Sequence, residues 1–256
     1  MDACYCCAFI QSRVVFKKTI RNALITYMSW EIITKIFDFF LPRICPSCKQ
    51  KLNSSEQIIC DKCFDKLKLT PESLIEEEYH KKFALKKYIK EFHPIFIFEK
   101  DKEIQHIIHS LKYNRHFRVG VYFGKITGNQ IKDKIFKWQV DLIIPVPLHS
   151  VKKAERGYNQ SEFIAKGISL ETGIDWNKKI IKRKKYTETQ THLSAEERQS
   201  NVKDAFIVKD KKSVNGKNLL LVDDVITTGS TISECAHQLL LAGAKNIYAT
   251  SIAIAE

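Results

Sequence analysis

Three sequence signatures of common catalytic folds are missing from this 256-residue chain. No Gly-x-Gly-x-x-Gly turn follows an apolar run, which excludes a Rossmann dinucleotide site. No Gly-x-x-x-x-Gly-Lys sequence provides the phosphate loop of a nucleoside triphosphatase. The chain also has no Gly-x-Ser-x-Gly elbow, so it lacks the nucleophile of an α/β hydrolase. Its chemistry must therefore rest on other motifs.

A membrane-spanning run and a secretory leader are also lacking. Residues 1–28 contain no clean apolar core and no small-residue cleavage site, and Met28 is a second plausible start. We therefore expect 1–28 to be an upstream extension or a disordered leader. Residues 29–41 place apolar side chains on one helical face, but three charged residues interrupt them. This pattern favours a packing helix over a membrane span or a peripheral membrane helix, and predicts a cytoplasmic protein.

The composition is basic, with a formal net charge of +13 and a pI near 9.3. Such a charge favours an anionic partner, either polyphosphate or nucleic acid. A Lys-rich chain with only nine glycines is also typical of a genome with biased composition. The charge alone therefore does not identify nucleic acid as the partner. With 44% apolar residues, the chain is long enough for one full core and a small appended module.

Four of the eight cysteines form two Cys-x-x-Cys pairs, Cys45 with Cys48 and Cys60 with Cys63. Each pair can aim two thiolates at one metal, so together they complete a tetrahedral zinc ribbon. Zinc contributes about 10–16 kcal/mol in such peptides, which folds a module almost without a core. We therefore expect the ribbon and the following domain to have separate cores. A redox role is the alternative, but nothing places either pair at a thioredoxin-like strand-to-helix junction.

The most informative stretch runs from Leu219 to Thr231. Its apolar start predicts a strand buried on both faces, as in a parallel sheet, and two adjacent carboxylates at the strand end are costly unless they bind something. A hydroxyl-rich turn follows and leads into a helix N-terminus, which suits a phosphate. The stretch therefore describes a ribose 5-phosphate pocket, with the candidate residues Asp223, Asp224, Val225, Thr227, Thr228, Gly229, Ser230 and Thr231.

These thirteen residues resemble the ribose-phosphate motif of the type I phosphoribosyltransferases. The resemblance implies that Asp223 and Asp224, the candidate catalytic pair, hold the ribose hydroxyls of phosphoribosyl pyrophosphate, and that the threonine turn holds its 5-phosphate. In that family a loop after an earlier strand binds pyrophosphate, and the strand at 141–147 is followed here by a matching loop. Its candidate contacts are Leu148, His149, Lys152, Arg156, Gly157 and Tyr158, with Arg183 from farther along the chain.

Arg156 and Lys152 can neutralise phosphates, and Gly157 permits a tight backbone approach. A basic surface turn is the alternative for this loop. Lys112, in a Lys-Tyr pair after an earlier helix, is a further candidate for contacting the pyrophosphate by resemblance to related chains.

The chain is also similar to the ComF family over about residues 32–255. The similar positions include Arg183, Thr187, Gln190, Leu193, Glu197, Arg198, Asn201, Val202, Ala205 and Phe206. The zinc knuckles, the Arg-Gly-Tyr-Asn-Gln loop at 156–160 and the Asp-Asp motif appear in family order. ComF proteins are type I phosphoribosyltransferase homologues with an N-terminal zinc module. They are tied to competence, the uptake of DNA during transformation, usually beside a helicase-like partner.

We therefore expect an α/β chain with a parallel-sheet, type I phosphoribosyltransferase-like domain at 92–256. A small N-terminal zinc ribbon with its packing helix occupies 29–68. The strongly charged segment 69–91 is expected to be a linker or a solvated helix.

Two functions remain open from the sequence. One is a phosphoribosyltransferase, a glycosyltransferase of the pentosyl class, that uses Mg²⁺ as a charge clamp and an unidentified acceptor. The other is a non-catalytic adaptor that binds single-stranded DNA and senses a ligand through its pocket. A basic run beside an aromatic that can stack on a base is the candidate nucleic-acid patch: Lys182, Arg183, Lys184, Lys185 and Tyr186.

Overall fold

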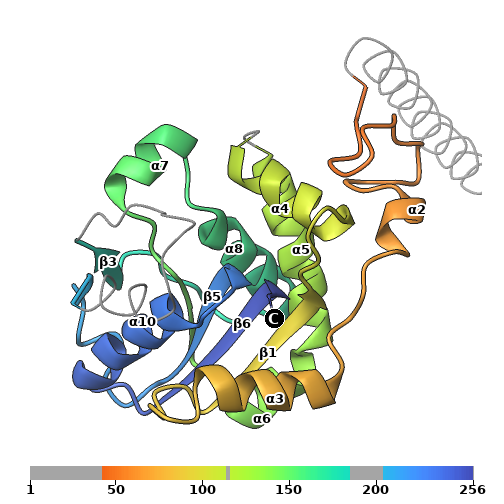
Figure 1. Cartoon of the computed structure of the whole chain (residues 1–256). Helices are drawn as coiled ribbons and strands as arrows, with labels where there is room; N and C mark the ends of the chain where they lie inside the picture. Colours follow the sequence, from red (N-terminus) through yellow and green to blue (C-terminus); the bar gives the residue numbers. More distant parts are fainter. Residues whose placement is uncertain (1–41, 114–115, 185–203, 256) are drawn as a thin grey trace, which may run out of the picture.

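The computed structural model describes residues 42–113, 116–184 and 204–255 (Figure 1). Its helices are α2 (Asp61–Phe64), α3 (Glu72–Lys82), α4 (Glu103–Tyr113), α5 (Phe117–Gln130), α6 (Lys132–Trp138), α7 (Ser150–Arg156), α8 (Gln160–Thr172) and α10 (Ser230–Leu241). Its strands are β1 (Glu91–Ile97), β2 (Leu142–Pro145), β3 (Ile181–Arg183), β4 (Phe206–Val208), β5 (Asn218–Ile226) and β6 (Asn246–Ile254). The predictions for 1–28, for the helix at 29–41, and for Lys185 and Tyr186 lie outside the described residues.

A four-stranded parallel sheet in the order β1-β6-β5-β2 forms the centre of the molecule. β5 is an inner strand, with Leu219 opposite Ile247 of β6 on one side and Leu142 of β2 on the other. Because β5 is covered on both faces, it reads as a continuous apolar run and not as an alternating one. The predicted α/β class and the order strand, helix, parallel strand for β5, α10 and β6 are confirmed.

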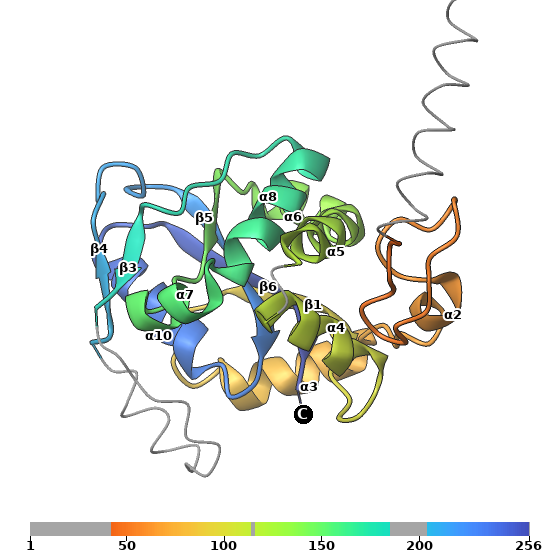
Figure 2. The same cartoon turned by 90° about the horizontal axis from the view of Figure 1, so that it is seen from above.

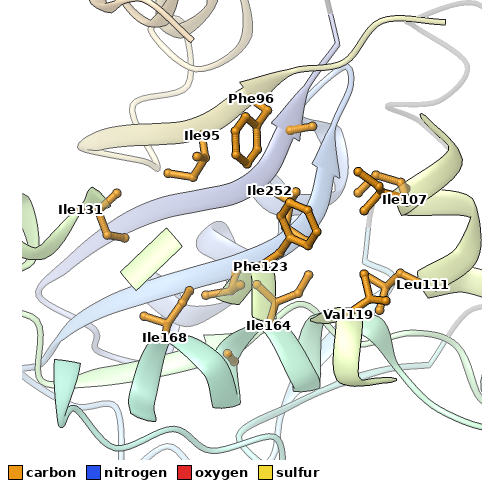
Figure 3. Close-up of a cluster of buried hydrophobic side chains, with 14 of the residues drawn as sticks. Ile95, Phe96, Ile107, Leu111, Val119, Phe123, Ile131, Ile164, Ile168 and Ile252 are labelled. Carbon is orange, nitrogen blue, oxygen red and sulfur yellow. The ribbon is translucent and has the colours of Figure 1, made fainter. Parts of the chain in front are cut away.

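Helices cover both faces of this sheet (Figure 2). On one face, α4, α5 and α8 pack around Phe123, Ile164 and the β6 residue Ile252 (Figure 3). On the other face, the residue that follows α3, Phe83, and the α10 residue Leu239 are buried. Each fully buried side chain of this size contributes about 1.5–3 kcal/mol, so the two layers hold the strand ends in fixed positions.

Close glycine contacts bring α8 against α5. A Cβ on Gly124 would lie 2.3 Å from the carbonyl oxygen of Ile164, and a Cβ on Gly167 would lie 2.3 Å from that of Val121. No side chain fits at either glycine unless a helix moves. The contact therefore fixes α8, whose first turn reaches the carboxyl end of β5.

The charged segment 69–91 holds α3, and this helix is only partly solvated. Ile75, Phe83 and Ile89 are buried in the same cluster as the sheet, and Glu78 is also fully buried. The cost of burying the Glu78 carboxylate is offset because Lys81 and Lys82, one turn later, form ion pairs with it. The few apolar residues of this segment hold one side of α3 against the sheet. Only the opposite side of α3 is the solvated face that the sequence predicts.

The segment 42–68, which holds the four cysteines, lies at the side of the domain next to α4 and α5 (Figure 2). Our expectation of two separate cores is wrong, since Cys45, Cys60 and Cys63 belong to the same buried cluster as Phe96 and Phe123. The partly buried side chains of Phe64, Leu67 and Tyr122 pack against this cluster and fill the junction. Backbone pairing continues the connection, because Lys68 and Thr70 bond to β1.

Among the residues that the structure describes, no helix has the length and apolar character needed to cross a bilayer.

Candidate functional site

The acidic pair and the hydroxyl-rich turn lie together at the carboxyl end of β5. The strand ends at Ile226, and α10 begins four residues later at Ser230. Gly229 makes the turn possible because its φ of 71° is in the left-handed region, which a glycine adopts without strain. In an open parallel sheet, the carboxyl ends of the strands are where ligands bind, and the predicted motif lies there.

Each carboxylate of the pair has partners from the neighbouring helices. Lys112, near the end of α4, places its Nζ 3.1 Å from Asp224 Oδ2. The first turn of α8 contributes Ser161, whose hydroxyl donates to Asp223 Oδ1 at 3.0 Å, and Gln160, which donates to Asp224 Oδ2 at 3.4 Å. The pair is thus held by a cation and two neutral donors, so both side chains have defined positions before a ligand binds.

Burial and the charge of Asp224 raise the pKa of Asp223 to about 7. The main-chain amide of Asp224 and the hydroxyl of Ser161 donate to the Asp223 carboxylate and oppose this rise without cancelling it. Near neutral pH Asp223 is therefore partly protonated. A protonated carboxyl can donate a hydrogen bond as well as accept one.

The turn after the pair encloses a small pocket of about 40 Å³. Its lining residues are Asp223, Val225, Ile226, Thr227, Thr228, Gly229, Ser230, Thr231 and Ile232. The hydroxyls of Thr228 and Ser230 are 3.0 Å apart, and the Ser230 amide at the start of α10 donates to Thr228 Oγ1 at 3.4 Å. Helix N-terminal amides next to hydroxyl donors are suited to an anionic oxygen.

Residues after β2 form a short helix, α7, where the sequence led us to expect a loop. The side chain of His149 caps α7 by accepting from the amide of Val151, and Gly157 ends it with a φ of 83°. Gly157 therefore ends the helix in the left-handed conformation that favours glycine at a helix C-terminus.

Basic side chains of this region converge on one another. The Arg156 guanidinium lies 5.3 Å from the centre of the Tyr113 ring, a cation–π distance. Burial and the nearby charges of Arg183 and Arg156 lower the pKa of Lys152. Tyr158 is held by a short hydrogen bond to the carbonyl of Leu111. A like-charged cluster of this kind is costly without an anion, which fits the predicted role in binding pyrophosphate.

Arg183 belongs to both predicted basic groups, and it is less exposed than the lysines on either side of it. Its guanidinium lies 5.4 Å from the centre of the Phe206 ring, and its charge interacts with that of Asp223. Lys182 and Lys184, by contrast, are exposed. The described part of the predicted nucleic-acid patch therefore presents two exposed lysines, while Arg183 turns toward the acidic pair.

Gln160 and Ser161 are contacts that the sequence reasoning missed. They follow Asn159, whose side chain accepts from the Ser161 amide and caps α8. A helix cap directly after the basic loop is a usable signal, because the first turn of that helix has to face the neighbouring strand ends. Lys112, which the sequence predicts to contact the pyrophosphate, pairs with the Asp224 carboxylate in the structure.

The four predicted zinc ligands come together. The Sγ atoms of Cys45, Cys48, Cys60 and Cys63 all lie within 4.8 Å of one another, and three of the four side chains are buried. Burial raises the pKa of Cys45, but donated backbone hydrogen bonds outweigh it and lower the value to about 7. A buried thiol set at this spacing can hold one metal ion, and sulfur ligands in a tetrahedral arrangement are those of zinc.

Comparison with known proteins agrees with this geometry. The family model "Phosphoribosyl transferase domain" matches residues 118–255. The chain is 34% identical over 152 residues to "DNA utilization protein YhgH" of Salmonella typhimurium, an alignment that covers 55% of this chain and 63% of that protein. It is 34% identical to "Competence protein F" of Haemophilus influenzae, over 57% of this chain and 66% of that one.

"Competence protein ComFC" of Bacillus subtilis is less similar in sequence, but its alignment covers more of this chain. It is 26% identical over 78% of this chain and 72% of its own length. Among solved structures, a purine phosphoribosyltransferase from Pyrococcus horikoshii overlaps 52% of this chain and 73% of its own, at 17% identity and a TM-score of 0.34. The assignment therefore rests on the family model, the relatives and the sheet topology: the chain belongs to the phosphoribosyl transferase family and, within it, to the ComF proteins.

Proposed function

We propose that this chain binds phosphoribosyl pyrophosphate with Mg²⁺ and acts as a phosphoribosyltransferase in the handling of DNA taken up by the cell. The observation that carries the proposal is the joint position of Asp223, Asp224 and the pocketed threonine turn at one strand end. An acidic pair suits vicinal hydroxyls, and the turn suits a phosphate at the far side of the same sugar. Neither feature alone would be specific.

Each part of the ligand has a matching set of side chains. The ribose hydroxyls would lie on Asp223 and Asp224, and the 5-phosphate on the amides and hydroxyls from Thr227 to Thr231. The pyrophosphate would face the basic cluster of Lys152 and Arg156. Bound Mg²⁺ would neutralise the pyrophosphate, and the carboxylate oxygens of the site are of the kind that this hard cation prefers.

Transfer of the ribosyl group would pass through a transition state with positive charge on the sugar. The acidic pair, held by Ser161 and Lys112, can stabilise that charge without forming a covalent bond. The basic cluster stabilises the negative charge that develops on the departing pyrophosphate. No described side chain is placed as a base for an acceptor, which leaves the nucleophile to the acceptor itself.

The cellular role is proposed from the relatives. Proteins named for competence and DNA utilization align with this chain over more than half of its length. We extend that role to this chain, together with a structural zinc ion at the four cysteines and a helicase-like protein partner. The described residues add no specific observation for the non-catalytic adaptor, because two exposed lysines are all that they show of its patch.

A pyrophosphate-release assay tests the catalytic part of the proposal. Purified protein with Mg²⁺ and phosphoribosyl pyrophosphate should release pyrophosphate when the correct acceptor is added, and Asp223→Asn should abolish the release. Tight binding with no release from any nucleobase, nucleotide or single-stranded DNA would contradict catalysis and favour a ligand-sensing role.

A further inference from the structure

We propose that the cavity at the outer edge of β2 binds the phosphate of a nucleotide, and that this nucleotide is the acceptor; the acceptor role rests on the function proposed above. The cavity has a volume of about 330 Å³. It is lined by Pro145, Pro147, Leu148, Ser150, Lys153, Asn159, Glu162, Lys178, Lys179, Ile181, Lys182, Arg183 and Lys209. Small-molecule sites start at about this size.

The charge of the lining indicates an anionic ligand. Six of the lining side chains are cationic and one is a carboxylate, that of Glu162. Glu162 is already neutralised, because Lys153 and Lys178 lie 2.7 Å and 3.2 Å from its two oxygens. The remaining lysines at 179, 182 and 209 make no ion pair with any described residue. Several lysines around one cavity repel one another unless an anion binds there.

Part of the cavity lining is apolar and part is charged. Pro145, Pro147, Leu148 and Ile181 provide surface without hydrogen-bonding side chains. A phosphate ester with a flat or apolar remainder satisfies both parts of such a lining, whereas a neutral nucleobase satisfies only the apolar part. A nucleotide is therefore a better match than the free base.

The first turn of α8 connects this cavity to the acidic pair. Asn159 and Glu162 line the cavity, while Gln160 and Ser161, between them in sequence, bond to Asp224 and Asp223. Arg183 also belongs to both, since it lines the cavity and its charge interacts with that of Asp223. A nucleotide bound in the cavity therefore contacts the same helical turn that bonds to the proposed ribose site. An acceptor has to lie next to the ribose in this way.

The test compares thymidine 5′-monophosphate with thymidine by calorimetric titration of the full chain. The parent should bind the monophosphate at least about tenfold more tightly, since one charge-assisted phosphate contact is worth about that factor. Lys179→Ala with Lys209→Ala should remove most of this preference while leaving the affinity for phosphoribosyl pyrophosphate within about twofold. The main-chain hydrogen bonds at both positions do not involve the lysine side chains, because the Lys179 and Lys209 amides donate to Asn177 and Ile180. The substitutions therefore leave these bonds in place.

The matched control changes the same charge elsewhere. Lys90→Ala with Lys245→Ala removes two exposed lysines from the opposite end of the sheet, just before β1 and β6 begin, and should leave monophosphate binding unchanged. Equal affinity for monophosphate and nucleoside, equal losses in both double variants, or strict competition between the monophosphate and phosphoribosyl pyrophosphate would overturn the proposal.

Two further arms separate its parts. In the first, a thymidine octamer with a 5′-phosphate is compared with the same octamer without it. If the phosphate raises the affinity of the octamer by a larger factor than it raises the affinity of thymidine, the phosphate that the cavity binds is that of a strand end. If the monophosphate pattern is found while phosphoribosyl pyrophosphate does not bind the parent, the proposed transferase function and the acceptor role both fall, and the cavity stands as a nucleotide site only.

Discussion

Replacing Asp223 by Asn should stabilise the protein at neutral and alkaline pH and have no effect in acid. In the folded protein the pKa of Asp223 is about 7, against an ordinary value of 3.8. Between these two values the folded state keeps a proton that the unfolded chain has lost, so the stability of the parent falls as pH rises from about 4 to about 7. Asn carries no such charge, and its amide oxygen can still accept from Ser161.

The size of the effect follows from that difference in pKa. The difference between about 7 and 3.8 corresponds to at most about 4 kcal/mol, and partial solvent exposure of the side chain reduces the expected gain to about 2 kcal/mol at pH 8. Urea unfolding followed by circular dichroism at pH 4.5, 6 and 8 measures it. The gain should be smallest at pH 4.5, just above the ordinary value of 3.8, and largest at pH 8.

Asp210→Asn provides a control with the opposite sign. Hydrogen bonds from the hydroxyl and amide of Ser213 lower the pKa of Asp210, so its charge stabilises the folded state once pH exceeds the ordinary value. That variant should lose stability at pH 8. If Asp223→Asn were no more stable than the parent at pH 8, or gained equally at every pH, the reasoning about the crowded acidic pair would be refuted.

Three further changes test other parts of the structure. Elemental analysis of the purified protein should find one zinc per chain, and well under one equivalent of metal would contradict the site. Because the cysteines share a core with the rest of the domain, replacing any of the four should also destabilise the packing of α4 and α5. Lys112→Ala leaves buried Asp224 without its cation and should cost about 1–3 kcal/mol in urea unfolding, whereas an unchanged midpoint would mean the ion pair is not formed. Gly229→Ala should cost more than Gly173→Ala, since both glycines have positive φ but only at 229 would a Cβ lie 2.7 Å from the Phe83 ring; equal losses would contradict that contact.

The arrangement of the candidate site was largely predictable from sequence, because it lies in one contiguous stretch. The strand, the acidic pair and the hydroxyl-rich turn all follow from the order of apolar, acidic and hydroxyl residues between Leu219 and Thr231. The four-cysteine cluster was predictable for the same reason, since the spacing within each Cys-x-x-Cys pair is local. The parallel sheet followed from the apolar run of β5 and the helix-length connection to β6.

The partners of the acidic pair were not predictable in this way. Lys112 and Ser161 reach Asp224 and Asp223 from helices far away in the sequence, and only the packing of α4 and α8 on the sheet brings them there. The contact of Phe83 with Gly229 was missed because the charged composition of α3 conceals a buried side. These are tertiary effects, which local pattern and charge do not contain.

The central claim is that Asp223, Asp224 and the following turn bind phosphoribosyl pyrophosphate. Calorimetric titration of this compound with Mg²⁺ into the parent and into a double variant, Asp223→Asn with Asp224→Asn, tests it most directly, with circular dichroism to show that both proteins are folded. We predict one binding site per chain in the parent and no detectable binding in the double variant. Equal affinity of the two folded proteins would contradict the account.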